Sequence, residues 1–465
     1  MPSFALAALI LFASLLAGQT VPQVLPIAIR NVTIVDVVDG KSIPDSALLL
    51  RDHKIAYAGP SAGLVVPPGT KIVDGAGKFA IPGLWDMHVH LWETENLLPL
   101  YVAYGVTGVQ DMGSNFDRVK AWRKAIEDGK AIGPRIITPG PAVDGRPSPE
   151  PKLPVLVATT AIEARKAFDK LYDLDVDFTK VLSGLPRDAY FALAEQTRHW
   201  NLPLRGHVPT SITVWEAVEA RQRTIEHLFG VPYACSSELP DLEPERQQAL
   251  LAQDRAALRK INERAENSFS EDRCAALFRE SAKLGTAYTP SLTLWRRMLN
   301  LDLDVMMKDP RLAAMPAPIR KAWPDPRKDV AGRTPQVETL QRQYLQKLAR
   351  IVLLLREGGV MTLAGTDTGD AYTVPGATLQ DELVELVQAG LKPVDALRAA
   401  TLTPAQFLGL TDSMGKIAPG MAADLVLLDA DPLEDIRAVR KIDAVFTRGR
   451  YFTRDDLDRL RTPAK

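Results

Sequence analysis

Two histidines one residue apart are the first feature of this chain with evident chemistry. His88 and His90 close the stretch Ile81-Pro82-Gly83-Leu84-Trp85-Asp86-Met87-His88-Val89-His90, in which a Pro-Gly turn leads into a short apolar run. On a strand, residues i and i+2 point to the same face, so the two imidazoles could hold one ion together. A bare His-x-His pair is short and common, and it more often marks two partly buried strand residues.

Four further polar residues stand at or near the ends of apolar, β-rich runs, namely Lys180, His207, His227 and Asp367. Taken singly, each has a structural explanation. The lysine could point into solvent, the two histidines could be hydrogen-bonded core residues, and the aspartate could cap the following helix. Four of the six histidines of the chain nevertheless fall at such ends, together with this lysine and aspartate. Because all of these residues fall at the ends of predicted strands, we predict that they form one site.

These residue types together suit a divalent metal centre. Imidazoles and a carboxylate are ligands for zinc and its neighbours, and a catalytic site leaves one position open for water. A protonated lysine would repel the ion, but a neutral Lys180 that has reacted with carbon dioxide offers two carbamate oxygens. Burial and nearby cations favour the neutral amine. Such a carbamate could bridge two metal ions, which lie about 3.5–4 Å apart in two-metal sites.

The stretches that carry these residues alternate with helical ones, a rhythm that is typical of parallel α/β sheets. The number of units predicts a closed (β/α)8 TIM-type barrel, whose enzymes carry their chemistry at the carboxyl ends of the strands. Strands are expected at 105–111, 135–138, 178–182, 204–208, 224–228 and 360–367, and helices at 116–128, 160–174, 187–200, 214–221, 379–389 and 393–401.

Strand-like sequence at both ends of the chain predicts a second unit. β-branched runs and turns fill residues 25–80, and similar composition returns within 412–458. We expect the two ends to pair into a small β-sandwich, with the barrel spanning 81–411. Charged, mostly helical sequence near 239–278 and 294–356 indicates insertions over one barrel mouth. Either a lid or simply extended outer helices would account for them.

The composition and the N-terminal residues limit the possible binding partners and indicate where the protein is located. The 465 residues carry a net charge of -1, which gives no general attraction to nucleic acid or to an anionic membrane. The uncharged apolar run Phe4–Leu16, followed by Ala17 and Gly18, predicts a signal peptide over residues 1–18 and an exported protein, periplasmic or secreted. The positive residues that usually precede such a run are missing, so an uncleaved anchor is the alternative. Cys235 and Cys274 could pair or remain separate core residues.

The motifs together resemble the amidohydrolase superfamily, and most closely its subgroup of imidazolonepropionase-like and Xaa-Pro dipeptidase-type enzymes. The pattern Gly-x-Ile-x-Pro-Gly-x-x-Ala-Asp-Leu-Val, which begins at Gly415, is a particularly specific part of the likeness. The other matching segments are 81–90, 104–107, 178–182, 205–208, 225–227 and 364–368.

The resemblance implies a role for each candidate residue. His88 and His90 would bind the first of two divalent ions, zinc foremost, together with Asp367. Lys180, as its carbamate, would bridge to a second ion held by His207 and His227. Asp367 would take a proton from the attacking, metal-bridging hydroxide and pass it to the leaving amine. The fold that the family implies, a barrel with a small sandwich from both termini, agrees with the element pattern.

One segment departs from the resemblance. Relatives that cleave dipeptides usually have a Gly-Gly-His segment after the third strand, whose histidine helps to hold the substrate. Here residues 139–146 read Pro-Gly-Pro-Ala-Val-Asp-Gly-Arg, and no histidine lies between His90 and His199. The metal ligands therefore match while these substrate contacts do not. Arg146, Arg205 and Tyr288 could meet a carboxylate or carbonyl, but each is more commonly structural.

Several functions remain open at this point. A binuclear hydrolase opening a C–N bond of a small amide or peptide-like molecule, such as an N-acyl amino acid or dipeptide, is favoured by Lys180. A mononuclear deaminase or a hydrolase of cyclic amides or imidazolones would use one ion and leave Lys180 free. An esterase or lactonase could use the same site, and a non-catalytic binding protein would be expected to lack a ligand. The pattern does not fix the oligomeric state, and a homo-oligomer remains open.

Overall fold

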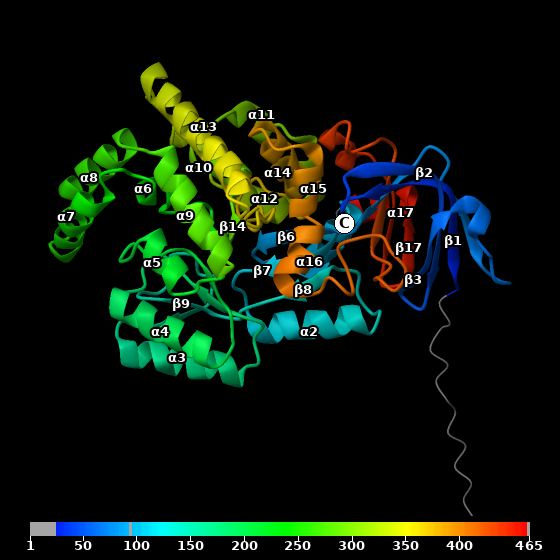
Figure 1. The fold of residues 1–465 in the computed structure, drawn as a ribbon, viewed down its shortest axis with the longest axis horizontal. Coiled ribbons are helices and arrows are strands. Elements are labelled where there is room, and N and C mark those ends of the chain that lie inside the picture. Colours follow the sequence, from blue (N-terminus) through cyan, green and yellow to red (C-terminus); the bar gives the residue numbers. More distant parts are fainter. Residues whose placement is uncertain (1–24, 93–94, 463–465) are drawn as a thin grey trace, which may run out of the picture.

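The computed structural model describes residues 25–92 and 95–462, with helices and strands combined in an α/β fold (Figure 1). The expected signal peptide over 1–18 lies outside the described residues. Among the helices that are described, none is both long and apolar enough to cross a membrane.

Strands from both ends of the chain pair in one eight-stranded sheet, ordered β17-β16-β15-β5-β1-β2-β3, with β4 beside β1. The junction is antiparallel and joins β5 to β15, with Pro82 opposite Leu425 and Phe79 opposite Leu428. One set of apolar side chains from these strands forms a core of its own. The strands are β1 (Ile27–Asp36), β2 (Lys41–Arg51), β3 (Lys54–Pro60), β4 (Lys71–Asp74), β5 (Phe79–Pro82), β15 (Leu425–Leu428), β16 (Ile442–Thr447) and β17 (Arg450–Thr453).

The central strands are parallel and fall into three further sheets, with orders β6-β7-β8, β10-β9-β11-β12 and β13-β14. A single closed eight-stranded sheet is not observed among the described pairings. The strands are β6 (Leu84–Val89), β7 (Val106–Asp111), β8 (Arg135–Ile137), β9 (Ala142–Asp144), β10 (Val155–Val157), β11 (Thr179–Val181), β12 (Leu204–Gly206), β13 (Thr224–Glu226) and β14 (Ala287–Thr289).

The expected strand at 360–367 is not a regular strand, because its backbone N–H groups donate in turn to Tyr288, Ala399 and His88. Leu363 N–H donates to the carbonyl of Tyr288, whereas Thr366 and Asp367 N–H donate to the carbonyl of His88. Isolated parallel bridges join Tyr288 to Thr362 and Val89 to Thr368. The segment therefore lies between β14 and β6.

Helices follow most of the parallel strands and begin at recognisable caps. Asn115 accepts the N–H of Arg118 at the start of α2, and Thr160 and Thr213 form capping boxes for α3 and α5. The helices of this part are α1 (Leu98–Ala103), α2 (Phe116–Glu127), α3 (Ala161–Asp173), α4 (Arg187–His199), α5 (Val214–Glu219), α14 (Ala377–Gln388), α15 (Pro393–Ala399) and α16 (Leu402–Leu408), with α17 (Arg454–Arg461) near the end of the chain.

The two charged stretches are helical, as expected. After the short helix α6 (Val231–Ala234), the first holds α7 (Leu239–Leu251), α8 (Arg255–Asn267) and most of α9 (Glu271–Leu284). The second holds most of α10 (Leu292–Met298), then α11 (Leu303–Met307), α12 (Ala317–Ala322) and α13 (Pro335–Glu357). Figure 1 shows α7 and α8 at the end of the molecule away from the terminal sheet. A disulfide joins Cys235, which follows α6, to Cys274 of α9, so the two cysteines do pair.

Candidate metal centre

The six predicted residues come from the carboxyl ends of the parallel strands and the segment after α13. His88 lies near the end of β6 and His90 just after it, Lys180 is in β11, and His207 and His227 directly follow β12 and β13. Asp367 lies in the segment between β14 and β6. Because the carboxyl ends of parallel strands share one edge, these residues meet there.

His88 and His90 face the same carboxylate. His88 Nε2 and His90 Nε2 each lie 3.3 Å from Asp367 Oδ1. The His88 ring is fully buried, and its Nδ1 lies 2.8 Å from Glu226 Oε2. An N–H on Nδ1 that donates to Glu226 leaves the lone pair on Nε2, which then faces Asp367 and the centre of the site.

His227, His207 and Lys180 complete the cluster. The ring of His227 lies 4.3 Å from that of His88 and 5.3 Å from that of His207. Ser183 Oγ is 2.9 Å from Nδ1 of His207 and fixes the orientation of that ring. The Lys180 side chain is fully buried, and its charge interacts with those of Glu226 and Asp367.

The cluster fits a metal ion. Ligand atoms of His88, His227 and Asp367 all lie within 4.8 Å of one another. Within the described ranges, His88 Nε2, His227 Nδ1 and Lys180 Nζ are buried and have no hydrogen-bond partner. Buried polar atoms are nearly always satisfied, so the unsatisfied nitrogens of His88 and His227 beside the Asp367 carboxylate fit a bound cation. Nitrogen and carboxylate donors of this kind suit zinc.

Burial sets the charge state of the nitrogen ligands. It lowers the pKa values of His207 and His227 well below the ordinary value, and the neighbouring positive charges act in the same direction. Burial also lowers the pKa of Lys180 to about 8, although Glu226 and Asp367 oppose it. A neutral imidazole is the form that binds metal, and a neutral amine is the form that takes up carbon dioxide.

The two carboxylates are held ionised. Burial would raise the pKa of Asp367, but His227, His88 and His90 together hold it well below its usual range. Burial likewise opposes ionisation of Glu226, and the positive neighbours His88, Lys180 and His227 lower the pKa of that group to about 2. For His88, burial and Lys180 act to lower the pKa, and Glu226 and Asp367 outweigh them and raise it. The cluster therefore carries negative charge available to a cation.

Two of the site residues adopt a left-handed backbone. His227 and Asp367 both have φ of 58°, a region that residues other than glycine seldom adopt. Hydrogen bonds hold each in place, from His227 N–H to the carbonyl of Thr289 and from Asp367 N–H to the carbonyl of His88. Such conformations persist where the surroundings impose them, and they cluster at functional sites.

Buried carboxylates that were not predicted from the sequence lie behind the candidate ligands. Glu226 accepts hydrogen bonds from Thr224 and His88. Asp111 accepts from Ser114 Oγ at 2.6 Å and Thr138 Oγ1 at 2.6 Å, and Asp86 accepts from Thr366 Oγ1 at 2.7 Å. The signal that could have found them is a carboxylate inside an apolar strand, since such groups are almost never buried unless paired.

The three residues considered for substrate contacts have other surroundings. Arg205 is buried, donates to the Gln110 side chain and stacks over Phe178 and Phe407. Tyr288 bonds to Ser281 at 2.9 Å in the interior. Arg146 is exposed. The first two thus have structural partners.

Comparison with known proteins finds similarity to amidohydrolases. A sequence model described as the amidohydrolase family matches residues 335–451. An adenine deaminase of Rubrobacter xylanophilus is 35% identical over 91 residues, which are 20% of this chain and 15% of that protein. An imidazolonepropionase of Myxococcus xanthus is 38% identical over 82 residues, 15% of this chain and 20% of that protein. The matches thus span less than two thirds of these curated relatives.

Solved structures show the fold over nearly the whole chain. A bottromycin amidohydrolase superposes with a TM-score of 0.71 at 24% identity, covering 93% of this chain and 88% of that one. A Xaa-Pro dipeptidase with methionine bound in its active site gives 0.64 at 18% identity, covering 92% and 100%. The chain thus shares its fold with amidohydrolases and with an enzyme of the dipeptidase type, and its residues 335–451 match the amidohydrolase family.

Proposed function

We propose that this protein is a metal-dependent hydrolase that opens a C–N bond in a small amide or peptide-like substrate. The observation that carries the proposal is the buried cluster of His88, His227 and Asp367, with ligand atoms within 4.8 Å of one another and with Lys180 Nζ unpaired beside it among the described residues. The match of residues 335–451 to the amidohydrolase family supports hydrolysis of C–N bonds as the reaction class.

In this proposal His88 and His90 would hold one divalent ion with Asp367, and His207 and His227 would hold a second. Lys180, as its carbamate, would supply oxygen ligands to both. When bound, the ions would polarise the scissile carbonyl and make a water nucleophilic at neutral pH. Glu226 keeps His88 in the tautomer with a free Nε2. Asp367, ionised and beside both first-strand histidines, accepts a proton at its carboxylate and returns it to the leaving nitrogen.

The same proposal includes the organisation of the chain. The three parallel sheets and the segment 360–368 would be arcs of one (β/α)8 barrel over 81–411, and 25–80 with 412–458 would form the terminal sandwich unit. The bonds from 360–368 to both β14 and β6 support closure. Residues 1–18 would direct export, and the partner would be a small-molecule substrate.

The test is metal content per chain, measured after purification with zinc and bicarbonate and compared with a Lys180→Ala variant. About two ions in the parent and clearly fewer in the variant are expected if the lysine bridges. A screen of N-acyl amino acids and dipeptides would follow. No bound metal in the parent would overturn the proposal.

A mononuclear deaminase is the second candidate. It is favoured by the single compact group of His88, His227 and Asp367 and by the similarity to adenine deaminases. About one ion in both the parent and the Lys180→Ala protein would support it. The substrate screen would then move to amino-substituted bases and cyclic amides.

A further inference from the structure

An arginine of α10 lies beside the candidate metal centre, and the proposed hydrolysis gives it no role. Arg297 Nη2 donates to the carbonyl of Thr366 at 3.5 Å, and Thr366 directly precedes Asp367. The side chain is partly buried. Burial lowers the pKa of Arg297, and the charges of Asp370 and Asp367 act in the opposite direction. A guanidinium remains protonated under these conditions, so a cation stands next to the carboxylate of the cluster.

Helix α10 is fixed in this position by contacts at both of its sides. The Trp295 indole donates to the carbonyl of His227 at 2.7 Å, which ties the helix to one candidate ligand. Glu382 of α14 accepts the N–H groups of the first two residues of the helix at 2.8–2.9 Å. The position of Arg297 is therefore set before a ligand binds, which lowers the cost of binding one.

The two neighbouring arginines of α10 differ in their partners. Arg296 forms ion pairs with Glu385 and Asp302. For Arg297, no carboxylate lies within ion-pair distance among the residues that the structure describes. A guanidinium has five N–H donors, and the Thr366 carbonyl takes one of them. Because charges withdrawn from water are usually paired, the remaining donors are suited to an anion that enters the site.

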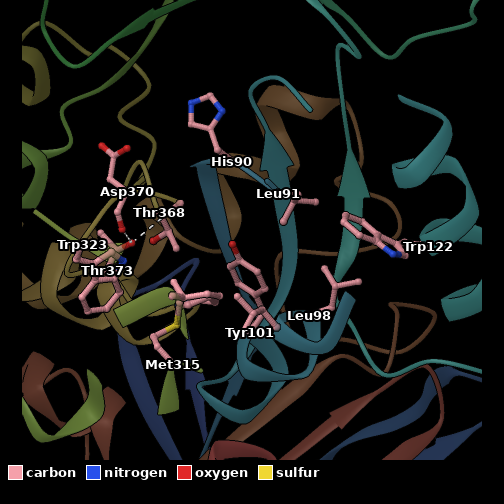
Figure 2. A pocket seen from close by; sticks show the side chains of 14 residues that line it. His90, Leu91, Leu98, Tyr101, Trp122, Met315, Trp323, Thr368, Asp370 and Thr373 are labelled. Carbon is pink, nitrogen blue, oxygen red and sulfur yellow. Dashed lines mark hydrogen bonds between the residues drawn. The ribbon is translucent and has the colours of Figure 1, made fainter. Parts of the chain in front are cut away.

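Asp370 lies near Arg297 but does not occupy its donors. In Figure 2 the His90 ring and the Asp370 carboxylate both point to the top of the view, above the Tyr101 ring. Burial and the charge of Asp367 raise the pKa of Asp370, and Arg297 and His90 act against them. These charges therefore lie around the same part of the site, and Asp370 offsets the field of Arg297 from beyond ion-pair distance.

We propose that Arg297 binds a carboxylate of the substrate and so selects amides that carry an anionic group near the scissile C–N bond. This inference rests on the proposed function and narrows it to acidic substrates, such as N-acyl amino acids. A guanidinium can meet a carboxylate through two parallel N–H···O bonds, which fix the orientation of the bound molecule. Arg297 is then a specificity-determining residue, and the proton transfer stays with Asp367.

The test measures binding of two hydroxamates, which chelate metal, to the zinc-loaded full chain by calorimetry. One probe is the monohydroxamate of succinate, whose free carboxylate is anionic at neutral pH. The other is succinamic hydroxamate, in which a neutral primary amide of nearly the same shape replaces that carboxylate. The anionic probe should bind about 10-fold more tightly at low salt, and added salt should reduce this preference.

Substitutions assign the preference to the guanidinium. Arg297→Met and Arg297→Gln remove the charge and should each reduce the preference to within about twofold, with binding of the neutral probe unchanged. Arg297→Lys keeps the charge without the two-pronged geometry and should retain an intermediate preference. The matched control is Arg279→Met, which changes an exposed arginine of α9 and should leave the preference as in the parent. Thermal melting and zinc content check that each variant is folded and loaded.

The outcomes separate the two proposals. Equal affinity of the parent for the two probes, or a preference that persists without the Arg297 charge, would overturn the role of Arg297 and leave the metal function standing. Failure of both hydroxamates to bind the zinc-loaded parent would overturn the proposed metal function, and this inference with it.

Discussion

At the scale of single residues, Glu226 supports the candidate metal site by orienting His88, although it is not itself one of the predicted ligands. It is fully buried, and its Oε2 lies 2.8 Å from His88 Nδ1. This contact selects the His88 tautomer and fixes the ring. A residue that acts in this way through a proposed ligand is a positioning residue, and we expect the free energy of metal binding to depend on it.

We predict that Glu226→Gln weakens zinc binding about 10- to 100-fold, because the amide is a poorer acceptor for Nδ1–H and no longer balances the buried positive charge. Competition with a chromogenic chelator measures the affinity. The matched control is Glu219→Gln, which changes an exposed glutamate on α5 and should have no effect. An affinity of Glu226→Gln within twofold of the parent would contradict the positioning role.

The six candidate residues could be selected from the sequence because each follows an apolar strand-like run, and such ends meet in a parallel sheet. Glu226 could not be selected in the same way, because it precedes His227 and the alternation of a short strand does not show which of two adjacent polar residues faces inward. The Ser183 contact to His207 also depends on three-dimensional proximity of two loops. The candidate ligands could therefore be predicted from the sequence, whereas the contacts that orient them could not.

At the scale of elements, the N-terminus of α10 is capped by a carboxylate from another helix. Glu382 of α14 accepts the N–H groups of Leu292 and Thr293 and the Thr293 hydroxyl at 2.8–2.9 Å. The group is fully buried, and burial raises the pKa of Glu382 from 4.5 to about 7 despite these donors. The stability of this contact between α10 and α14 should therefore depend on pH.

We predict that Glu382 makes stability fall as pH rises from about 4.5 to about 7. The folded protein holds the proton more tightly than the unfolded chain, so the folded state binds more protons in this window and loses stability as they leave. The loss is up to about 3 kcal/mol. Urea unfolding of the parent and of Glu382→Gln, at several pH values, measures it. A constant difference between the two proteins across this range would contradict the assignment.

The disulfide stabilises the first helical insertion. Cys235 and Cys274 are 39 residues apart and enclose α7 and α8. We predict that a Cys235→Ala/Cys274→Ala variant loses about 4 kcal/mol of unfolding free energy, because the unfolded chain regains the freedom of that loop. Denaturant unfolding with and without reductant measures it, and the variant should not respond to reductant. If the denaturant midpoint of the variant equals that of the parent, the entropy of the closed loop does not contribute to the unfolding free energy.

Helices with clear periodicity could be predicted from the sequence, but only some of the short strands could. Periodicity located α2, α3 and α4 closely. Of the three-residue strands, β8, β11, β12 and β13 fall in the predicted runs, whereas β9, β10 and β14 escaped, because three residues alone carry no usable alternation. The segment 360–368 was expected as a strand because its composition is apolar, but its division among several partners is set by tertiary contacts.

At the scale of the whole molecule, pairing of β5 with β15 joins the two ends of the chain in one sheet. Arg135 of β8 reinforces the arrangement through an ion pair of 3.0 Å with Asp424, just before β15. Local patterns predicted strands at both ends, and the structure shows that they pair. The isolated bridge between Val89 and Thr368 brings the segment 360–368 beside β6, and no local pattern reveals this long-range contact.

We predict that a chain ending at residue 411 does not reach the native fold. It would lack the partner strand of β5 and the apolar residues Leu425 and Leu427, which are fully buried. Circular dichroism and size exclusion should show an aggregated or poorly packed product. Co-expression of residues 412–465 as a separate chain should restore part of the native protein, whereas a monomeric, cooperatively melting fragment would contradict the expectation.

The late partner of β5 also affects how the protein matures. Lys78 and Asp429, which form an ion pair of 2.6 Å at this junction, are 351 residues apart in sequence. At ~5–20 residues per second, a ribosome needs roughly 20 to 70 seconds to reach the second partner after making the first. During that interval the edge of β5 is an unpaired template for other strands. A nascent chain of this protein would therefore be a natural client for a chaperone that shields strand edges.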